Sequence, residues 1–326
     1  MIDDDEAARE PTMEFSMAAG SGDSRGLRVA IGPNQDRHLT DAVETAGGSV
    51  VPLAEAQILV WIGGPDGFPE LPDATEWVAL STAGIEHFVD AGVIDDKRLW
   101  TNASGFYARG VAEHALALLL GGTRQIVRSA KTRWAKDTVD PAVRTLRGST
   151  VSIIGAGGIG RELTPLLKAC GATVLAVSRS GHTVDGADVT MSADRTDEAL
   201  AESDHVVLAA PDTPETRHMI NDRTLTLLKP HSWVVNVARG PLIDQAALYR
   251  ALAAGALGGA ALDVTDPEPP ADDDPLFDLD NVVLTPHVAN PAGRLTEEMA
   301  PFLAENLRRF SAGDELLSLV EVGKGY

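Results

Sequence analysis

Residues 151–160, VSIIGAGGIG, decide the fold of this chain. The first four of these residues favour a β-strand, and leucines at helical spacing follow the last glycine. Between strand and helix, Gly155 allows a sharp turn, Gly157 lets a pyrophosphate approach bare backbone, and Gly160 permits tight packing of the helix on the strand. The start of the helix then offers unpaired N–H groups to phosphates. This order of elements predicts a dinucleotide-binding site.

Apolar runs on both sides of this stretch alternate with helical patterns, which is typical of parallel α/β layers. Before it, we expect a helix over residues 36–46 and strands over residues 27–31, 58–62, 77–81 and 99–102. After residues 151–154, which form the first strand of the second unit, we expect five more strands, over residues 173–177, 205–210, 232–237, 258–264 and 281–286. The second unit then has six strands. We therefore expect the α/β class, with two Rossmann-like domains, doubly wound parallel sheets and an active-site cleft between them.

Three further segments define the expected domain organisation. Residues 1–26 are acidic and rich in small residues, so we expect a disordered leader. We expect a long apolar helix from about residue 107 to about residue 134 to connect the two domains. A last helix over residues 297–311 is expected to fold back onto the first domain. The outer, substrate domain then comprises residues 27–114 and 299–326, and the dinucleotide domain residues 115–298. The long helix is exposed unless a second copy covers it, which predicts a homodimer.

Composition excludes several classes of partner. The 326-residue chain has a formal net charge of −21, which disfavours nucleic acid and anionic membranes as partners. No apolar run is long enough for a membrane span, and the N-terminus lacks the pattern of a signal peptide, so we expect a cytoplasmic protein. Cys170 is the single cysteine, which rules out a disulfide within the chain. The histidines lack metal-ligand spacing, so no metal is expected.

The end of the second strand of the dinucleotide unit indicates the cofactor. An Asp or Glu about 20 residues after the glycines would hold a ribose 2′-hydroxyl, but Ser178, Arg179 and Ser180 occupy that place. An arginine can make charge-assisted hydrogen bonds to a 2′-phosphate, and the hydroxyls add donors. We therefore expect NADP(H) to be preferred, with NAD(H) possible. In the alternative interpretation, Arg179 stacks on adenine or faces solvent.

Three polar residues lie at or just past the ends of late strands: Arg239, Glu268 and His287. In an open α/β sheet the ligand binds outside the carboxyl ends of the strands, so these side chains can converge on a nicotinamide. Arg239 can bind a carboxylate and polarise the adjacent carbonyl, and His287 can donate a proton as hydride arrives. Glu268 can hydrogen-bond the imidazole and stabilise its positive charge. This set predicts hydride transfer with general acid catalysis on a 2-oxo acid.

Several of these motifs occur together in one known family. The chain resembles the D-isomer-specific 2-hydroxyacid dehydrogenases in GAGGIG, NVARG at residues 236–240, ALDV…PEP at residues 261–269 and TPH at residues 285–287. VAEHALALLL at residues 111–120 and STAG at residues 81–84 match as well, and the resemblance extends from about residue 27 to about residue 312. Within the family, the chain is most similar in appearance to the NADPH-dependent glyoxylate/hydroxypyruvate reductases.

The resemblance implies a role for each matching residue. The substrate-binding arginine corresponds to Arg239, the relay glutamate to Glu268 and the proton donor to His287, with Arg239 and His287 facing both cofactor and substrate. The resemblance also implies four sets of cofactor contacts. The pyrophosphate would bind at Gly155, Gly157, Gly158, Ile159 and Gly160, and the adenosine side at Pro211 and Thr213. The nicotinamide carboxamide would bind Asp263, and Val237, Ala238 and Arg239 would lie beneath the nicotinamide ring. The substrate carboxylate would bind the backbone of Thr82, Ala83 and Gly84, with Trp61 beside the pocket, and His114 falls near the hinge.

Two functions follow as hypotheses. In the first, the chain is an enzyme that reduces a small 2-oxo acid of the glyoxylate or hydroxypyruvate kind to a D-2-hydroxy acid with NADP(H). In the alternative, it is a non-enzymatic protein of the same fold that senses NAD(P)(H). Such a sensor would capture a peptide in the presence of nucleotide while turning over no oxo acid.

Overall fold

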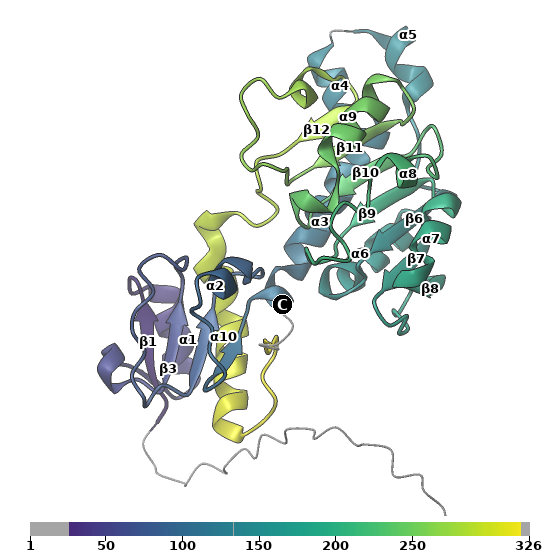
Figure 1. The fold of residues 1–326 in the computed structure, drawn as a ribbon. Coiled ribbons are helices and arrows are strands. Elements are labelled where there is room, and N and C mark those ends of the chain that lie inside the picture. Colours follow the sequence, from purple (N-terminus) through teal and green to yellow (C-terminus); the bar gives the residue numbers. More distant parts are fainter. Residues whose placement is uncertain (1–25, 133, 321–326) are drawn as a thin grey trace, which may run out of the picture.

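The computed structural model describes residues 26–132 and 134–320, and the chain forms two α/β lobes (Figure 1). The expected leader, apart from Gly26, lies outside the described residues. The chain passes between the lobes twice, after β5 (Leu99–Thr101) and before α10 (Leu295–Ala312). The two lobes are called the small and the large lobe below.

The small lobe is built on a five-stranded parallel sheet with the order β2-β1-β3-β4-β5. Its first strands match the expected positions, and the sheet gains one short strand that the sequence analysis missed, β2. The elements of this lobe besides β5 and α10 are β1 (Arg28–Gly32), α1 (Arg37–Thr45), β2 (Ser49–Val50), β3 (Ile58–Trp61), β4 (Trp77–Leu80) and α2 (Glu86–Asp90). All four residues of β3 and of β4 are buried, as expected for central strands covered on both faces.

The large lobe has a seven-stranded parallel sheet with the order β12-β11-β10-β9-β6-β7-β8. The chain reverses direction across the sheet between β6 and β9, the switch point at which doubly wound sheets bind ligands. The strands are β6 (Thr150–Ile154), β7 (Thr173–Ser178), β8 (Val189–Ser192), β9 (His205–Leu208), β10 (Trp233–Asn236), β11 (Gly259–Leu262) and β12 (Val282–Leu284). The helices are α3 (Ser104–Thr123), α4 (Ile126–Lys131), α5 (Lys136–Val139), α6 (Gly158–Ala169), α7 (Thr196–Glu202), α8 (Asp222–Leu225) and α9 (Gln245–Ala253).

The sheet therefore has seven strands rather than the six expected. The additional strand, β8, lies at the edge, and only Met191 of its four residues is buried. A short, half-exposed edge strand carries little apolar alternation, so its sequence gives a weak signal. The predicted parallel, doubly wound architecture is otherwise confirmed.

The expected single helix over residues 107–134 is wrong in its second half. Helix α3 ends at Thr123, and Gln125 adopts a left-handed backbone conformation with φ +56° before α4 begins. A Cβ at Gly122 would collide with the Trp233 ring, so the close packing of α3 on β10 requires glycine there. Glycine and threonine weaken the helix at that point, and the apolar pattern continues past the break. Helix α3 nevertheless connects the lobes as predicted.

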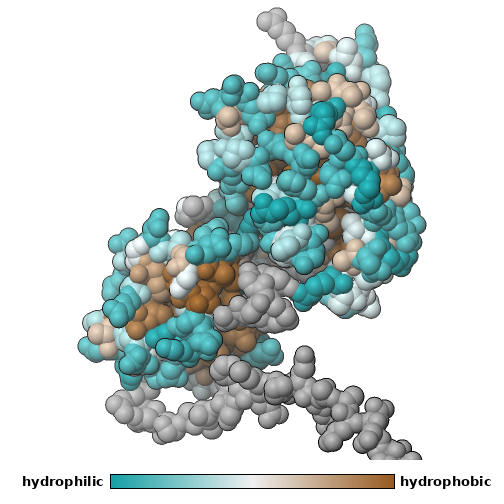
Figure 2. Space-filling model, viewed as in Figure 1, coloured by the Kyte–Doolittle hydropathy of each residue, from teal (hydrophilic) through white to brown (hydrophobic). Residues whose placement is uncertain are grey.

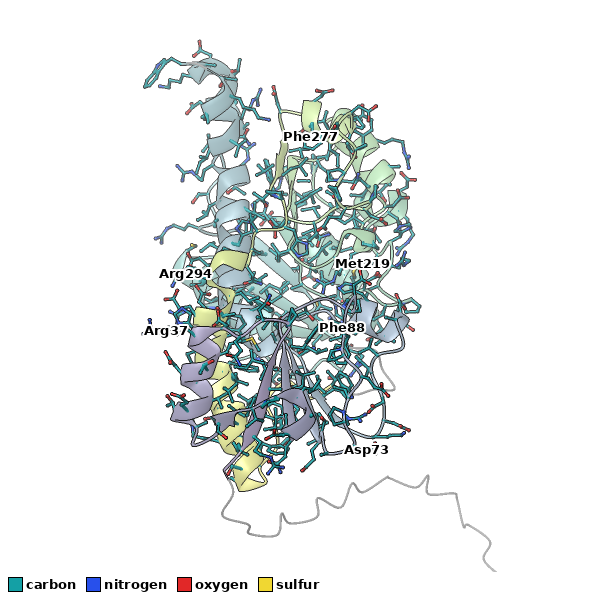
Figure 3. The ribbon with its side chains drawn as sticks, turned by 90° about the vertical axis from the view of Figure 1, so that its left-hand side faces the viewer. Arg37, Asp73, Phe88, Met219, Phe277 and Arg294 are labelled. Atoms are coloured by element: carbon teal, nitrogen blue, oxygen red, sulfur yellow. The ribbon has the colours of Figure 1, made fainter. Side chains whose placement is uncertain are left out.

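Helix α10 returns to the small lobe and packs beside α1, as Figures 1 and 3 both show. Its buried residues Met299, Leu303 and Leu307 share one apolar cluster with Leu39 of α1 and Val29 of β1. The proposed boundaries at residues 114/115 and 298/299 cut α3 and α10, respectively, and stay a prediction.

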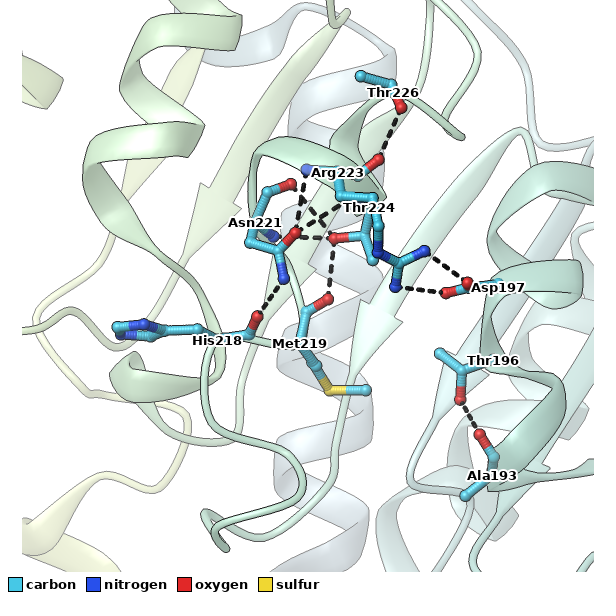
Figure 4. Close-up of polar contacts among 9 residues, drawn as sticks. All are labelled: Ala193, Thr196, Asp197, His218, Met219, Asn221, Arg223, Thr224 and Thr226. Atoms are coloured by element: carbon cyan, nitrogen blue, oxygen red, sulfur yellow. Dashed lines mark hydrogen bonds and ion pairs between the residues drawn. The ribbon is translucent and has the colours of Figure 1, made fainter.

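The connection from β9 to β10 is held by side chains at the start of α8 (Figure 4). Asn221 caps this helix by accepting hydrogen bonds from the backbone N–H groups of Arg223 and Thr224, and the Thr224 hydroxyl accepts one from the Asn221 N–H. The Arg223 guanidinium also pairs with Asp197 of α7, at 2.5 Å. This network stabilises the connection, which begins with the expected adenosine-side residues.

Hydrophilic residues cover most of the visible face of the large lobe, in keeping with the strongly acidic composition (Figure 2). In the described ranges, no helix combines the length and the apolar character needed to cross a bilayer.

Candidate active site

The glycine-rich turn after β6 lies at the switch point of the large sheet. Gly155 has φ +93°, and a Cβ on it would collide with the backbone of Ala210, so this position requires glycine. A Cβ on Gly157 would meet no atom within 4 Å, which leaves its backbone open to a ligand. Helix α6 begins at Gly158, and the first N–H groups of a helix have no partner within it. The turn thus has the shape and the donors that a pyrophosphate requires.

The end of β7 presents the residues expected near a ribose phosphate. Ser178 is buried, whereas Arg179 and Ser180 are exposed on the following turn. The hydroxyls of Ser178 and Ser180 lie 3.4 Å and 3.1 Å from Nδ1 of His182, which adds an imidazole to this group. His182 is one of the histidines that lack metal-ligand spacing, and the motifs gave it no role. Its position four residues after the strand was the signal that could have identified it.

The remaining cofactor positions lie along the same edge of the large sheet. Pro211 follows β9, and its carbonyl accepts a hydrogen bond from the Thr216 hydroxyl, which also accepts one from the Thr213 N–H. Val237 and Ala238 follow β10 and are each 6% exposed. These positions are compatible with the expected adenosine and nicotinamide contacts, which stay predictions.

The three expected catalytic residues follow strands that end at the same edge of the large sheet. Strands β10, β11 and β12 are adjacent and parallel, with Asn236 paired to Leu262 and Leu262 to Leu284. The segments that carry Arg239, Glu268 and His287 start directly beyond this register. The sheet therefore brings residues 48 positions apart in sequence to the same edge, as the strand order predicted.

Hydrogen bonds within the turn that follows β10 hold Arg239. The Asn236 side chain donates to the Arg239 carbonyl at 2.8 Å and accepts from the Ala238 N–H at 3.0 Å. The guanidinium donates through Nη1 to the Ala238 carbonyl at 2.7 Å. A Cβ on Gly240 would collide with the Thr265 carbonyl, so glycine lets this turn approach the segment leading to Glu268.

His287 and Glu268 form a close pair. The His287 Nδ1 lies 2.5 Å from Glu268 Oε1, and the two side chains are 51% and 40% exposed. His287 adopts φ +50°, an uncommon conformation for a residue other than glycine, and its N–H donates to the Asp263 and Thr285 carbonyls. The backbone strain is thus offset by two hydrogen bonds, which is typical of functional residues.

Asp263 is buried behind this pair and holds the His287 segment. Its carboxylate accepts hydrogen bonds from the Thr285 hydroxyl at 2.6 Å and from the N–H groups of Val288 and Ala289 at 3.0 Å each. His114 Nε2 of α3 lies 3.2 Å from Asp263 Oδ1. Burial opposes ionisation, but these hydrogen bonds prevail and lower the pKa of Asp263 to about 2. The expected carboxamide contact of Asp263 stays a prediction, and the structure adds this positioning role.

The turn after β4 faces the site from the small lobe. Its carbonyls are anchored by α3 and the residues before it, because Asn102 Nδ2 donates to the Ala83 carbonyl at 2.9 Å and the Tyr107 hydroxyl donates to the Ser81 carbonyl. Burial raises the pKa of Tyr107 to about 12. Within the described ranges, the N–H groups of residues 82–84 have no hydrogen-bond acceptor, and the buried Thr82 hydroxyl has none either. The turn therefore presents free donors suited to an anion.

Arg239 reaches this turn and thereby joins the two lobes. A Cβ on Gly84 would collide with Nη2 of Arg239, which places the guanidinium directly over the turn. The Arg239 Nε also lies 3.5 Å from Oε1 of Glu86, the second residue after the turn. Glu86 was not predicted from the motifs, although it follows the same strand end as the expected substrate-binding residues.

Trp61 lies at the carboxyl end of β3, beside β4. It is 4% exposed, donates through Nε1 to the Gly64 carbonyl at 2.8 Å, and packs edge-on against Phe68. The ring is thus part of the core of the small lobe, and its contact with substrate stays a prediction. In the part of the chain that the structure describes, no cluster of three or more histidine, cysteine, aspartate or glutamate side chains could hold a metal ion.

Comparisons with known proteins agree with this fold. Residues 115–289 match the model of the D-isomer specific 2-hydroxyacid dehydrogenase NAD-binding domain. An uncharacterised Corynebacterium melassecola protein is 41% identical over 295 residues, covering 88% of this chain and 96% of the relative.

Two solved structures are similar over their whole length. A D-isomer specific 2-hydroxyacid dehydrogenase from Xanthobacter autotrophicus Py2, in complex with NADPH and MES, has a TM-score of 0.78 at 28% identity and covers 93% of this chain and 100% of that chain. An NADPH-dependent glyoxylate/hydroxypyruvate reductase from Sinorhizobium meliloti, in complex with NADP and sulfate, has a TM-score of 0.75 at 26% identity, covering 92% and 100%.

Proposed function

Because the chain belongs to the D-isomer specific 2-hydroxyacid dehydrogenase family, a family of nicotinamide-dependent oxidoreductases, we propose that it reduces a small 2-oxo acid to the D-2-hydroxy acid with NADPH. The proposed substrates are of the glyoxylate or hydroxypyruvate kind. The observation that carries the proposal is the His287–Glu268 pair at the edge of the large sheet, on the same side as Arg239.

The substrate carboxylate is bound between the lobes in this proposal. The unpaired N–H groups of residues 82–84 donate to it from the small lobe, and the Arg239 guanidinium donates from the large lobe. A planar guanidinium can bind a carboxylate oxygen and the adjacent carbonyl oxygen together, which aligns the carbonyl and polarises it.

His287 donates the proton. Since Glu268 engages Nδ1, the donating nitrogen is Nε2, and the negative charge of Glu268 stabilises the imidazolium before transfer. Asp263 holds residues 287–289 in place from below, so that the imidazole is already oriented when substrate arrives.

The cofactor would lie along the carboxyl edge of the large sheet. The open backbone at Gly157 and the start of α6 fit the pyrophosphate, and Ser178, Arg179 and Ser180, with no carboxylate among them, fit a 2′-phosphate. When bound, NADPH supplies the hydride. The contacts proposed for Asp263, Pro211, Thr213 and residues 237–239 complete this site.

A homodimer is part of the proposal. One face of α3 packs in the core of the large lobe, and the separate short helix α4, which follows the break at Gln125, has no buried residue. Ile126 is 56% exposed and the nearby Trp134 is 95% exposed, an unusual position for large apolar side chains that a second copy would cover.

The test is the consumption of NADPH and of NADH, side by side, with glyoxylate, hydroxypyruvate and phenylpyruvate. Fast oxidation of NADPH with one of the two smaller acids supports the proposal. Activity with NADH alone would keep the reaction and reject the cofactor preference. Turnover with none of the pairs would reject the proposed reaction.

A further inference from the structure

We propose that Glu86 is a specificity-determining residue that restricts the site to 2-oxo acids with a single negative charge. The inference rests on the proposed function, because it concerns the same carboxylate site. Glu86 belongs neither to the sequence motifs nor to the expected catalytic residues.

The position of Glu86 is set by the start of α2. The helix begins at Glu86, two residues after Gly84, the last residue of the turn proposed to donate its N–H groups to the substrate, and the Glu86 side chain lies beside Gly84. Its Oε1 is 3.5 Å from Nε of Arg239, and both side chains are about one-third exposed, at 31% and 32%. A Cβ on Gly84 would collide with atoms of both side chains, so the two charged groups converge over one glycine.

One oxygen of the Glu86 carboxylate has no hydrogen bond that would explain its position. Oε2 of Glu86 is buried and has no hydrogen-bond partner among the described residues. A buried, unsatisfied carboxylate oxygen is costly, so a purely structural role for Glu86 would leave this position unexplained. An electrostatic role requires only the charge at this place.

The charges of the site indicate what that role is. In the proposed ground state, the cations Arg239 and protonated His287 are balanced by the anions Glu86 and Glu268. One substrate carboxylate can then be held by the cation and the neutral N–H donors. A second negative group on the substrate would give the occupied site a second excess negative charge, with no further cation among these four residues to offset it, and the charge of Glu86 adds to the repulsion. Like charges placed close together disfavour binding, so a dianion is discriminated against.

The experiment uses two inhibitors of nearly equal shape and different charge, oxamate with one negative charge and oxalate with two. Their inhibition constants against glyoxylate reduction are measured for the wild type, for Glu86→Gln and for Glu44→Gln. The control residue, Glu44, is exposed on α1 of the same lobe, so its variant makes the same change in net charge away from the site. Binding of both inhibitors to the NADPH-loaded enzyme, by calorimetry, gives the same comparison without turnover.

We expect Glu86→Gln to improve the binding of oxalate relative to oxamate by about tenfold, and Glu44→Gln to leave that ratio unchanged. The ratio of kcat/KM for oxaloacetate to that for 2-oxobutyrate should rise in parallel. A change in kcat that is equal for both substrates, with unchanged ratios, would overturn the proposal and leave Glu86 a positioning residue for Arg239. Failure of the wild type to reduce any oxo acid would reject the proposed function, whereas the calorimetric ratio would still decide the role of Glu86.

Discussion

Nδ1 of His287 and Oε1 of Glu268 lie 2.5 Å apart, although the two residues follow different strands of the large sheet. Both side chains are about half exposed, so the pair faces the open edge of the sheet rather than its core. The contact orients the imidazole, because Nδ1 faces Glu268 and Nε2 is left for the substrate. This relationship is the basis of the first prediction.

His287→Ala should lower kcat by about 10²–10⁴-fold, because the general acid is lost. NADPH affinity, measured by fluorescence titration, should stay close to that of the wild type. Glu268→Gln keeps the shape of the side chain and removes its charge, so it should lower kcat less. Full activity of His287→Ala would contradict the assigned proton donor.

Arg179→Ala should raise KM for NADPH about 10–100-fold and change KM for NADH little, since hydrogen bonds to charged groups contribute about 1.5–3 kcal/mol. Arg37→Ala is the matched control, because Arg37 lies on α1 and its side chain is 87% exposed. An equal increase in KM for NADPH and for NADH in Arg179→Ala would show that Arg179 does not bind the 2′-phosphate.

Asp263→Asn should destabilise the protein by about 2–3 kcal/mol, because the amide replaces an acceptor with a donor among the N–H groups of Val288 and Ala289. Thermal unfolding measures this loss, and kcat should fall in the same variant since residues 287–289 lose their anchor. Asp272→Asn, at an exposed position, is the control. A stable variant with reduced activity would instead indicate that Asp263 acts mainly on the cofactor.

His205 makes stability depend on pH. Burial lowers the pKa of His205 to about 4, and its Nδ1 accepts the Trp233 N–H, so the folded state keeps the imidazole neutral. The unfolded chain binds this proton near pH 6.5, and stability is therefore complete above that pH and falls as the pH drops toward 4. The loss should be about 3 kcal/mol.

Urea unfolding between pH 7 and pH 4 checks this dependence. His205→Asn keeps a hydrogen-bond acceptor and removes the titration, so its profile should be flatter over that range. An equally steep profile in the variant would assign the dependence to other groups. The carboxyls of Asp204 and Asp263, each with a pKa lowered to about 2, contribute stability that is lost only below about pH 4.

Light scattering should give a mass of twice the 34.3 kDa chain, because the α3–α4 region exposes apolar side chains. Ile126→Asp places a charge on that surface and should give the monomer mass with unchanged circular dichroism. A dimer that persists in Ile126→Asp would place the interface elsewhere on the molecule.

Local spacing in the sequence determined the dinucleotide turn and the edge at which the site lies. The roles of Gly155 and Gly157 depend on backbone geometry within a few residues of β6. A short sequence motif is therefore sufficient to predict them. Arg239, Glu268 and His287 could be grouped because parallel strands end at one edge of a sheet, so strand order alone brings them together.

Only the tertiary structure decided the contacts between segments that share no local pattern. The pairing of Glu86 with Arg239 depends on how the two lobes meet, and the requirement for glycine at position 122 depends on the Trp233 ring packed against it. The anchoring of the His287 segment by Asp263 and His114 joins α3 to the end of β11. Such contacts arise from packing in three dimensions, and hydrophobic periodicity reports only which face of a single element is buried.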